Sequence, residues 1–166
     1  MNCCFIGHKT IKRTNTLISS LRETVSFLIE NGVTSFLFGS ASEFDTLALE
    51  IVSELKKLYP FIKRVYVRSS CSKISKSYKD FLLESYENTY FPTKLENAGR
   101  CSYVERNYEM INLSSYCVFY YDENYEPAPT NKAKKKLLLP KARKSGTKIA
   151  YEYAKKKKKE IINLFK

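Results

Sequence analysis

The chain has 166 residues, a formal net charge of +12 and a hydrophobic fraction of 43%, which is enough for one globular domain with a core. Only 5 Gly and 5 Pro, beside 28% charged residues, exclude collagen-like, linker-like and disordered chains. No apolar run approaches the roughly 20 residues of a membrane span, and the first residues lack the pattern of a signal peptide. We therefore expect a cytoplasmic protein with no membrane partner.

The positive charge is concentrated at one end of the sequence. Residues 1–129 contain 15 Lys and Arg against 15 Asp and Glu, whereas residues 130–166 contain 14 Lys and Arg against Glu152 and Glu160. Such a basic region favours an anionic partner: nucleic acid, a phosphorylated small molecule or an acidic surface. The alternative is a solvated lysine-rich face, so nucleic acid remains one candidate partner for residues 130–166.

The cysteines and the histidine indicate neither a disulfide framework nor a metal site. The five cysteines form no C-x-x-C pair, and the chain has one histidine. Cys3 and Cys117 lie in apolar runs and are expected to be buried thiols. A catalytic pair of His8 with Cys3 or Cys4 is disfavoured, because successive strand residues point to opposite faces. We expect no metal and no cofactor.

Short apolar runs alternate with helical stripes along the whole chain. We expect strands at 3–6, 34–38, 62–67, 88–92, 116–121 and 160–164, and helices at 15–31, 44–58, 75–86, 103–113 and 146–158. This alternation predicts an α/β domain over 1–166, with a mostly parallel sheet and helices on both faces. Residues 123–144 contain three prolines and seven Lys or Arg, and are expected to be an inserted basic loop.

Ligands of open α/β sheets bind outside the carboxyl ends of the strands, which directs attention to three loops. Gly7, His8 and Lys9 follow the first strand, Gly39 and Ser40 follow the second, and residues 145–147 (SGT) open the last helix. Free N–H groups and a helix dipole favour phosphate there, although the same residues commonly cap helices. Neither glycine loop matches the dinucleotide or P-loop motif.

Asp45 follows the second of these loops and leaves three roles open. It could bind a ribose hydroxyl, act as an acid or base, or cap the helix in which it lies. Together with positive charge from Arg106 and Lys9, the loops predict a nucleotide-type ligand.

Four segments, in order, resemble a small bacterial and phage branch of the SLOG superfamily. Residues 4–9 (CFIGHK) are similar to its GHR start, although Lys9 replaces the arginine. Residues 38–48 (FGSASEFDTLA) resemble its G-x-x-x-G-x-D-x-x-A segment, with Glu43 in place of the second glycine. Residues 100–110 (RCSYVERNYEM) resemble its R-N-x-x-M helix, and residues 145–154 (SGTKIAYEYA) its S-G-T-x-x-A helix start.

The resemblance implies a Rossmann-like fold, a nucleotide-derived ligand and a homo-oligomer, a dimer or larger. The superfamily includes the Lonely Guy phosphoribohydrolases, DNA-processing protein A and sensor domains for cyclic ADP-ribose-type signals in anti-phage defence. The compartment implied is the cytoplasm of a bacterium or of a phage-infected cell.

One departure from the phosphoribohydrolases bears on catalysis. The last helix of those enzymes begins with a motif whose Glu works with an Arg to cleave the N-glycosidic bond. In this chain Arg106 matches the Arg, but Ala150 occupies the position of the Glu. Glu152 lies about 200° around the helix from Ala150 and should not replace it. The expectation is therefore binding without hydrolysis, for sensing or sequestering an immune signal, as a phage anti-defence sponge would.

Two alternatives stay open. One is a nucleotide N-glycosidase that uses Asp45, Glu152 and Arg106, and the other is a single-stranded nucleic-acid-binding protein. In the favoured interpretation Gly7 and His8 line the base or ribose, Arg106 pairs with phosphate, and the basic loop 132–144 closes over it. The expected ligand-binding residues are Gly7, His8, Lys9, Gly39, Ser40, Phe44, Asp45, Arg106, Asn107, Ser145, Gly146 and Thr147.

Overall fold

The computed structural model describes residues 1–70, 73–96, 98–126 and 144–166. The strands are β1 (Asn2–Gly7), β2 (Ser35–Phe38), β3 (Lys63–Val67), β4 (Asn88–Tyr90), β5 (Tyr116–Tyr120) and β6 (Glu160–Asn163). The helices are α1 (Asn15–Glu30), α2 (Glu43–Lys56), α3 (Lys76–Ser85), α4 (Ser102–Leu113) and α5 (Gly146–Lys156), with 3-10 turns η1 (Thr93–Leu95) and η2 (Gly99–Cys101) before α4.

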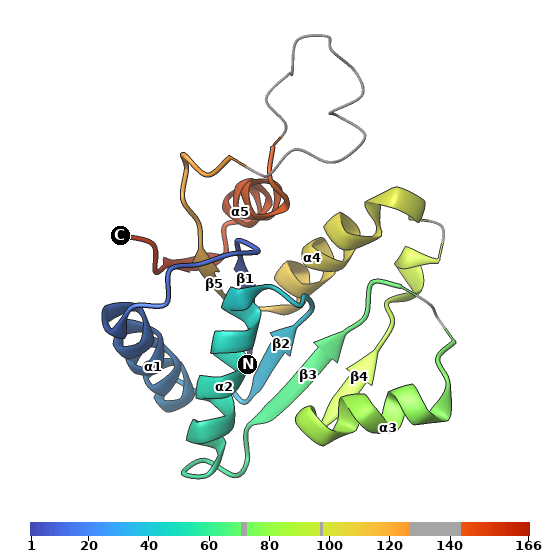
Figure 1. Cartoon of the computed structure of the whole chain (residues 1–166), viewed down its shortest axis with the longest axis horizontal. Helices are drawn as coiled ribbons and strands as arrows, with labels where there is room; N and C mark the ends of the chain where they lie inside the picture. The colour runs from blue at the N-terminus through green and yellow to red at the C-terminus, as the bar shows by residue number, and fades with distance from the viewer. Residues whose placement is uncertain (71–72, 97, 127–143) are drawn as a thin grey trace, which may run out of the picture.

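The strands form one six-stranded sheet in the order β4-β3-β2-β1-β5-β6, and every pair is parallel. The prediction of an α/β domain with helices on both faces is confirmed, and the mostly parallel sheet is in fact entirely parallel. Figure 1 shows α1, α2 and α3 on one side of the sheet and α4 and α5 on the other. The two 3-10 turns lie in a segment for which the sequence pattern gave no element.

Alternation along the strands builds two apolar layers. On the α1 and α2 side, Phe5 of β1 stacks with Phe36 and Phe38 of β2, with ring centroids 5.9 and 5.2 Å apart. On the other side, Cys4 and Leu37 pack beneath α4 and α5. This alternation places neighbouring strand residues in different layers, as the period of two requires.

A hydroxyl side chain caps four of the five α-helices seen in the described residues and sets where they begin. Thr14, Ser42, Ser75 and Ser145 each accept a hydrogen bond from a backbone N–H in the first turn of α1, α2, α3 and α5 respectively. These caps fix the starts of α2 and α5 at the carboxyl edge of the sheet.

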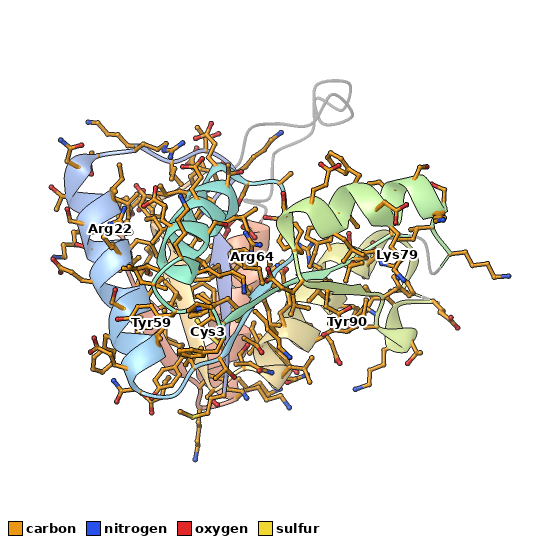
Figure 2. The ribbon with its side chains drawn as sticks, turned by 90° about the horizontal axis from the view of Figure 1, so that it is seen from below. Cys3, Arg22, Tyr59, Arg64, Lys79 and Tyr90 are labelled. Carbon is orange, nitrogen blue, oxygen red and sulfur yellow. The ribbon has the colours of Figure 1, made fainter. Side chains whose placement is uncertain are left out.

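Cys3, Cys4 and Cys117 are buried, as expected for Cys3 and Cys117. Burial raises the pKa of the Cys3 and Cys4 thiols, so both are protonated and unreactive at neutral pH. Figure 2 shows Cys3 inside the molecule, while Lys79 marks the outer helix α3.

Cys71 and residues 127–143, the greater part of the predicted basic loop, lie outside the described residues. No helix in the described ranges has the length and apolarity to cross a membrane.

Candidate functional site

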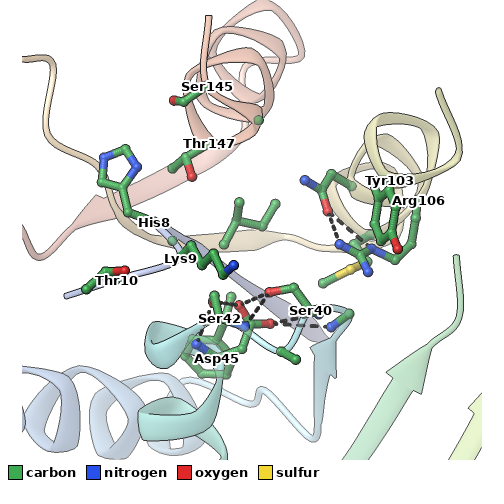
Figure 3. Close-up of a pocket in the computed structure, with 18 of the residues that line it drawn as sticks. His8, Lys9, Thr10, Ser40, Ser42, Asp45, Tyr103, Arg106, Ser145 and Thr147 are labelled. Carbon is green, nitrogen blue, oxygen red and sulfur yellow. Dashed lines mark hydrogen bonds between the residues drawn. The ribbon is translucent and has the colours of Figure 1, made fainter. Parts of the chain in front are cut away.

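A cavity of about 760 Å³ lies at the carboxyl ends of β1 and β2, between the starts of α2 and α5 and the side of α4. Figure 3 shows side chains from all these elements pointing into it. Of the twelve expected ligand-binding residues, eleven line this cavity. The twelfth, Phe44, is fully buried and lies beneath Gly7.

The closeness of Gly7 to Phe44 explains why glycine ends the first strand. A Cβ at Gly7 would lie 2.5 Å from Phe44 Cβ, which is closer than packed carbon atoms allow. Phe44 therefore supports the cavity floor through contact with β1.

Asp45 is buried, with 4% of its surface exposed, and all its hydrogen bonds come from its own loop. Its Oδ2 accepts the hydroxyls of Ser40 and Ser42, each at 2.6 Å. Its Oδ1 accepts the backbone N–H groups of Gly39 at 3.4 Å and Ser40 at 3.3 Å. The helix-cap role belongs to Ser42, whose hydroxyl accepts the Asp45 N–H, whereas the Asp45 carboxylate holds the β2–α2 loop that precedes the helix.

The network around Asp45 changes the expected role of Gly39 and Ser40. Their N–H groups were expected to hold a phosphate, but in the structure they donate to the Asp45 carboxylate. Burial raises the pKa of Asp45, opposed by these hydrogen bonds and by the charge of Arg106. The loop is thus closed on itself, and it shapes the cavity wall without offering these donors to a ligand.

Arg106 is the buried cation of the site, with 3% of its surface exposed. Its Nε and Nη2 donate to the side-chain oxygen of Asn107, at 3.3 and 3.0 Å. It takes part in none of the ion pairs that the described residues form. Burial lowers the pKa of Arg106, although a guanidinium stays charged at neutral pH.

Gly39 makes room for this arginine. A Cβ at Gly39 would lie 2.6 Å from Arg106 Nε and 2.7 Å from Met110 Sδ. The guanidinium also lies over the Tyr103 ring, with its central carbon 5.6 Å from the ring centroid. Arg106 is thus held in place by packing, while most of its five N–H donors have no acceptor among the described residues.

His8 is buried with only 2% of its surface exposed, and it lines the cavity next to Tyr125. The backbone N–H of Asp122 donates to His8 Nε2 at 2.9 Å, which places the ring proton on Nδ1. His8 Nδ1 is buried and has no hydrogen-bond partner among the described residues, and the Tyr125 ring stacks on the imidazole at 3.8 Å. Burial lowers the pKa of His8, so the ring is neutral at pH 7.

The start of α5 faces the cavity, as Ser145 and Thr147 in Figure 3 show. The Ser145 hydroxyl is used as the cap, because it accepts the Lys148 N–H at 3.1 Å. The helix is 11 residues long. Its N-terminus, with free N–H groups and the positive end of the helix dipole, faces the cavity. The side chain of Thr147 is buried, with 6% exposed.

Glu152, the other carboxylate of the enzyme alternative, does not line the cavity. It is partly exposed on α5 and pairs with Lys144, whose Nζ lies 2.7 Å from its Oε2. Asp45 is therefore the sole acidic side chain among the described residues that line the cavity. No cluster of His, Cys, Asp or Glu that could hold a metal ion occurs in the part of the chain that the structure describes.

Eight further lining residues are outside the expected set: Phe5, Ile6, Thr10, Ala41 and Ser42 adjoin the predicted loops, and Tyr103, Met110 and Tyr125 come from elsewhere. Tyr103 and Met110 lie three residues before and four after Arg106, and this helical spacing could have placed them on the same face of α4. Tyr125 comes from the segment after β5, and nothing in the sequence pattern indicates that it stacks on His8.

The basic residues of the C-terminal part have mixed surroundings. Lys159 Nζ donates to the backbone oxygens of Asn112 and Ser114, and so caps the end of α4. Lys155 and Lys157 lie over the rings of Tyr151 and Tyr153, at 4.8 and 5.5 Å. Part of this lysine run therefore contributes to packing within the chain.

The parallel sheet defines a Rossmann-like α/β protein, and the cavity at its carboxyl edge is its candidate ligand site, at the switch between β1, β2 and β5. The chain belongs to the YspA SLOG family, whose family model matches residues 5–154. This match confirms the resemblance drawn from the four segments. No curated protein matches the chain. Membership of the family indicates nucleotide-related ligand binding or processing.

Proposed function

We propose that this protein binds a nucleotide-derived anion in the cavity and holds it without cleaving it. Arg106 carries the proposal, because a buried guanidinium with a single amide oxygen as its acceptor is costly unless an anion completes it. Phosphate is the natural partner, since its oxygens match the two-pronged guanidinium. The positive start of α5 and the exposed Lys9 favour the same charge.

Two observations support binding in preference to N-glycosidic hydrolysis. Asp45 has both carboxylate oxygens occupied by its own loop, so it is poorly placed to act as base or nucleophile. Glu152 lies outside the cavity and pairs with Lys144. A protein that retains its ligand intact suits a sensor or a sponge for an immune signal, and that biological use is part of the proposal.

The test follows binding and turnover together. The purified protein is incubated with a panel of nucleotides, cyclic dinucleotides and cyclic ADP-ribose isomers and then filtered. Mass spectrometry follows the filtrate and the ligand released by heating the retained protein. We expect one class of nucleotide to be depleted and recovered intact. The Arg106→Ala variant should bind it at least tenfold more weakly, since a charged hydrogen bond contributes ~1.5–3 kcal/mol.

Arg22→Ala is the matched control, because Arg22 is an exposed arginine of α1 that pairs with Glu54 away from the cavity. It removes the same charge and should leave binding unchanged. Free base and ribose phosphate exceeding one equivalent of protein would contradict the proposal and favour the N-glycosidase. If nothing is depleted while single-stranded nucleic acid binds with a steep salt dependence, the basic region 130–166 becomes the functional surface instead.

A further inference from the structure

A second cavity, of about 280 Å³, adjoins the first and is lined by α2 and α3. Ser40, Ala41 and Asp45 line both cavities. These shared residues, from the β2–α2 loop and the first turn of α2, lie between the two cavities. A ligand seated at Arg106 has a neighbouring space within the same site.

Aromatic side chains form much of the wall of the second cavity. The rings of Tyr66 and Tyr86 lie 5.2 Å apart, and those of Tyr78 and Phe81 lie 6.4 Å apart and nearly parallel. Burial raises the pKa of Tyr66 and Tyr86, so both hydroxyls are neutral at physiological pH. Asp45 is the one charged residue in the lining, and its oxygens are already occupied. This chemistry suits a flat, neutral ring system and not a phosphate.

Helix α3 presents an aromatic face here that little else in the described structure covers. Tyr78, Phe81, Leu82 and Ser85 share one helix face by their spacing, and all four line the cavity. Only Leu82 of this helix is buried, whereas Phe81 is 62% and Tyr78 45% exposed. Two large exposed rings side by side at the rim of a cavity are typical of a binding surface.

We propose that the two cavities form one two-lobed site, and that its ligand carries two ring systems joined through phosphate, as a dinucleotide does. The phosphate lies at Arg106, and one ring stacks against Tyr78 and Phe81 beyond the Ser40–Ala41 wall. This inference rests on the proposed function and narrows its ligand from a nucleotide-derived anion to the dinucleotide class. A mononucleotide would leave the aromatic lobe unfilled.

Calorimetric titration with two probes tests the inference. AMP carries one ring system and diadenosine diphosphate carries two. We expect diadenosine diphosphate to bind about tenfold more tightly than AMP, because each stacked base contributes a factor of this size. Phe81→Ala and Tyr78→Ala should each remove most of this advantage, because they should weaken the binding of diadenosine diphosphate more than that of AMP. Both side chains are exposed, so neither change should impair folding.

Phe27→Ala is the matched control, because Phe27 is 54% exposed on α1 and lines neither cavity. It should change neither affinity. Equal affinities of the two probes, with AMP still bound, would overturn the two-lobed site and leave the proposed function standing. Binding of neither probe, together with no depletion of any member of the nucleotide panel, would contradict the proposed function itself. If Phe81→Ala changes the sedimentation of the protein but not its dinucleotide affinity, the face belongs to a second copy of the chain and the inference fails.

Discussion

Two buried charged side chains, Asp45 and Arg106, line the same cavity, and they differ in how many hydrogen bonds they form. Asp45 on α2 receives four hydrogen bonds from the loop that precedes it, whereas Arg106 on α4 donates, within the described part of the chain, only to the amide oxygen of Asn107. The two groups attract each other through space but form no ion pair. The carboxylate thus holds the cavity wall together, and the guanidinium is the group that the proposal assigns to the ligand.

The largest expected effect is a loss of stability when the Asp45 carboxylate is removed. Asp45→Ala leaves two hydroxyls and two N–H groups without their acceptor, and should lower the free energy of unfolding by about 3 kcal/mol. Asp45→Asn keeps one amide oxygen and should cost less. Urea denaturation measures both. Wild-type stability in Asp45→Ala, with loss of ligand binding, would instead assign Asp45 to the ligand.

The next effect concerns the floor of the cavity. Gly7→Ala places a Cβ against Phe44, which is fixed in the core, and should cost about 2 kcal/mol of stability. Gly146→Ala is the control, since nothing lies within 4 Å of a Cβ there. It should leave the unfolding midpoint unchanged or slightly raised. If the two variants unfold alike, the contact between Gly7 and Phe44 is not what requires glycine.

Gly39→Ala should separate binding from stability. Its Cβ meets the side chains of Arg106 and Met110, which can shift, so the stability loss should be smaller than that of Gly7→Ala. The displaced guanidinium should weaken nucleotide binding about tenfold, or ~1.4 kcal/mol. Calorimetry measures the affinity, and urea denaturation measures the free energy of unfolding of Gly39→Ala and Gly7→Ala. Unchanged affinity would mean that the position of Arg106 does not matter to the ligand.

The smallest effect is the pH dependence due to His8. Because its pKa is lowered in the folded protein, neutral His8 contributes stability above pH 6.5, and this is lost as the pH falls through the lower, folded value. His8 is the only histidine, so one NMR titration reads it directly. A pKa above 6.5 would contradict the buried neutral ring. His8→Gln should flatten the acid side of the stability curve.

The fold was predictable because its signals are local. Apolar runs such as 116–121, and helices ended by Gly32 or Pro60, fix the type and order of the elements. The site was predictable in outline, because the carboxyl ends of parallel strands meet at one edge. That rule predicted that Gly7, His8 and Gly39 lie close together, and all three line the cavity.

The partners of each group were not predictable. The sequence does not show that Asp45 occupies the N–H groups of Gly39 and Ser40, because this depends on how one loop folds back on its helix. It likewise hides the stacking of Tyr125 on His8 and the cavity against α3, since both join segments that are distant in the chain. Spacing alone did show correctly that Glu152 and Ala150 face different ways, since Ala150 is buried and Glu152 is exposed and pairs with Lys144.

One measurement tests the unsatisfied guanidinium directly: thermal unfolding of wild type and Arg106→Met, each with and without diadenosine diphosphate. A buried cation without an anionic partner costs stability, so the ligand-free variant should be at least as stable as wild type. The ligand should raise the melting temperature of wild type and not that of the variant. A destabilised Arg106→Met protein that the ligand still stabilises would contradict the account.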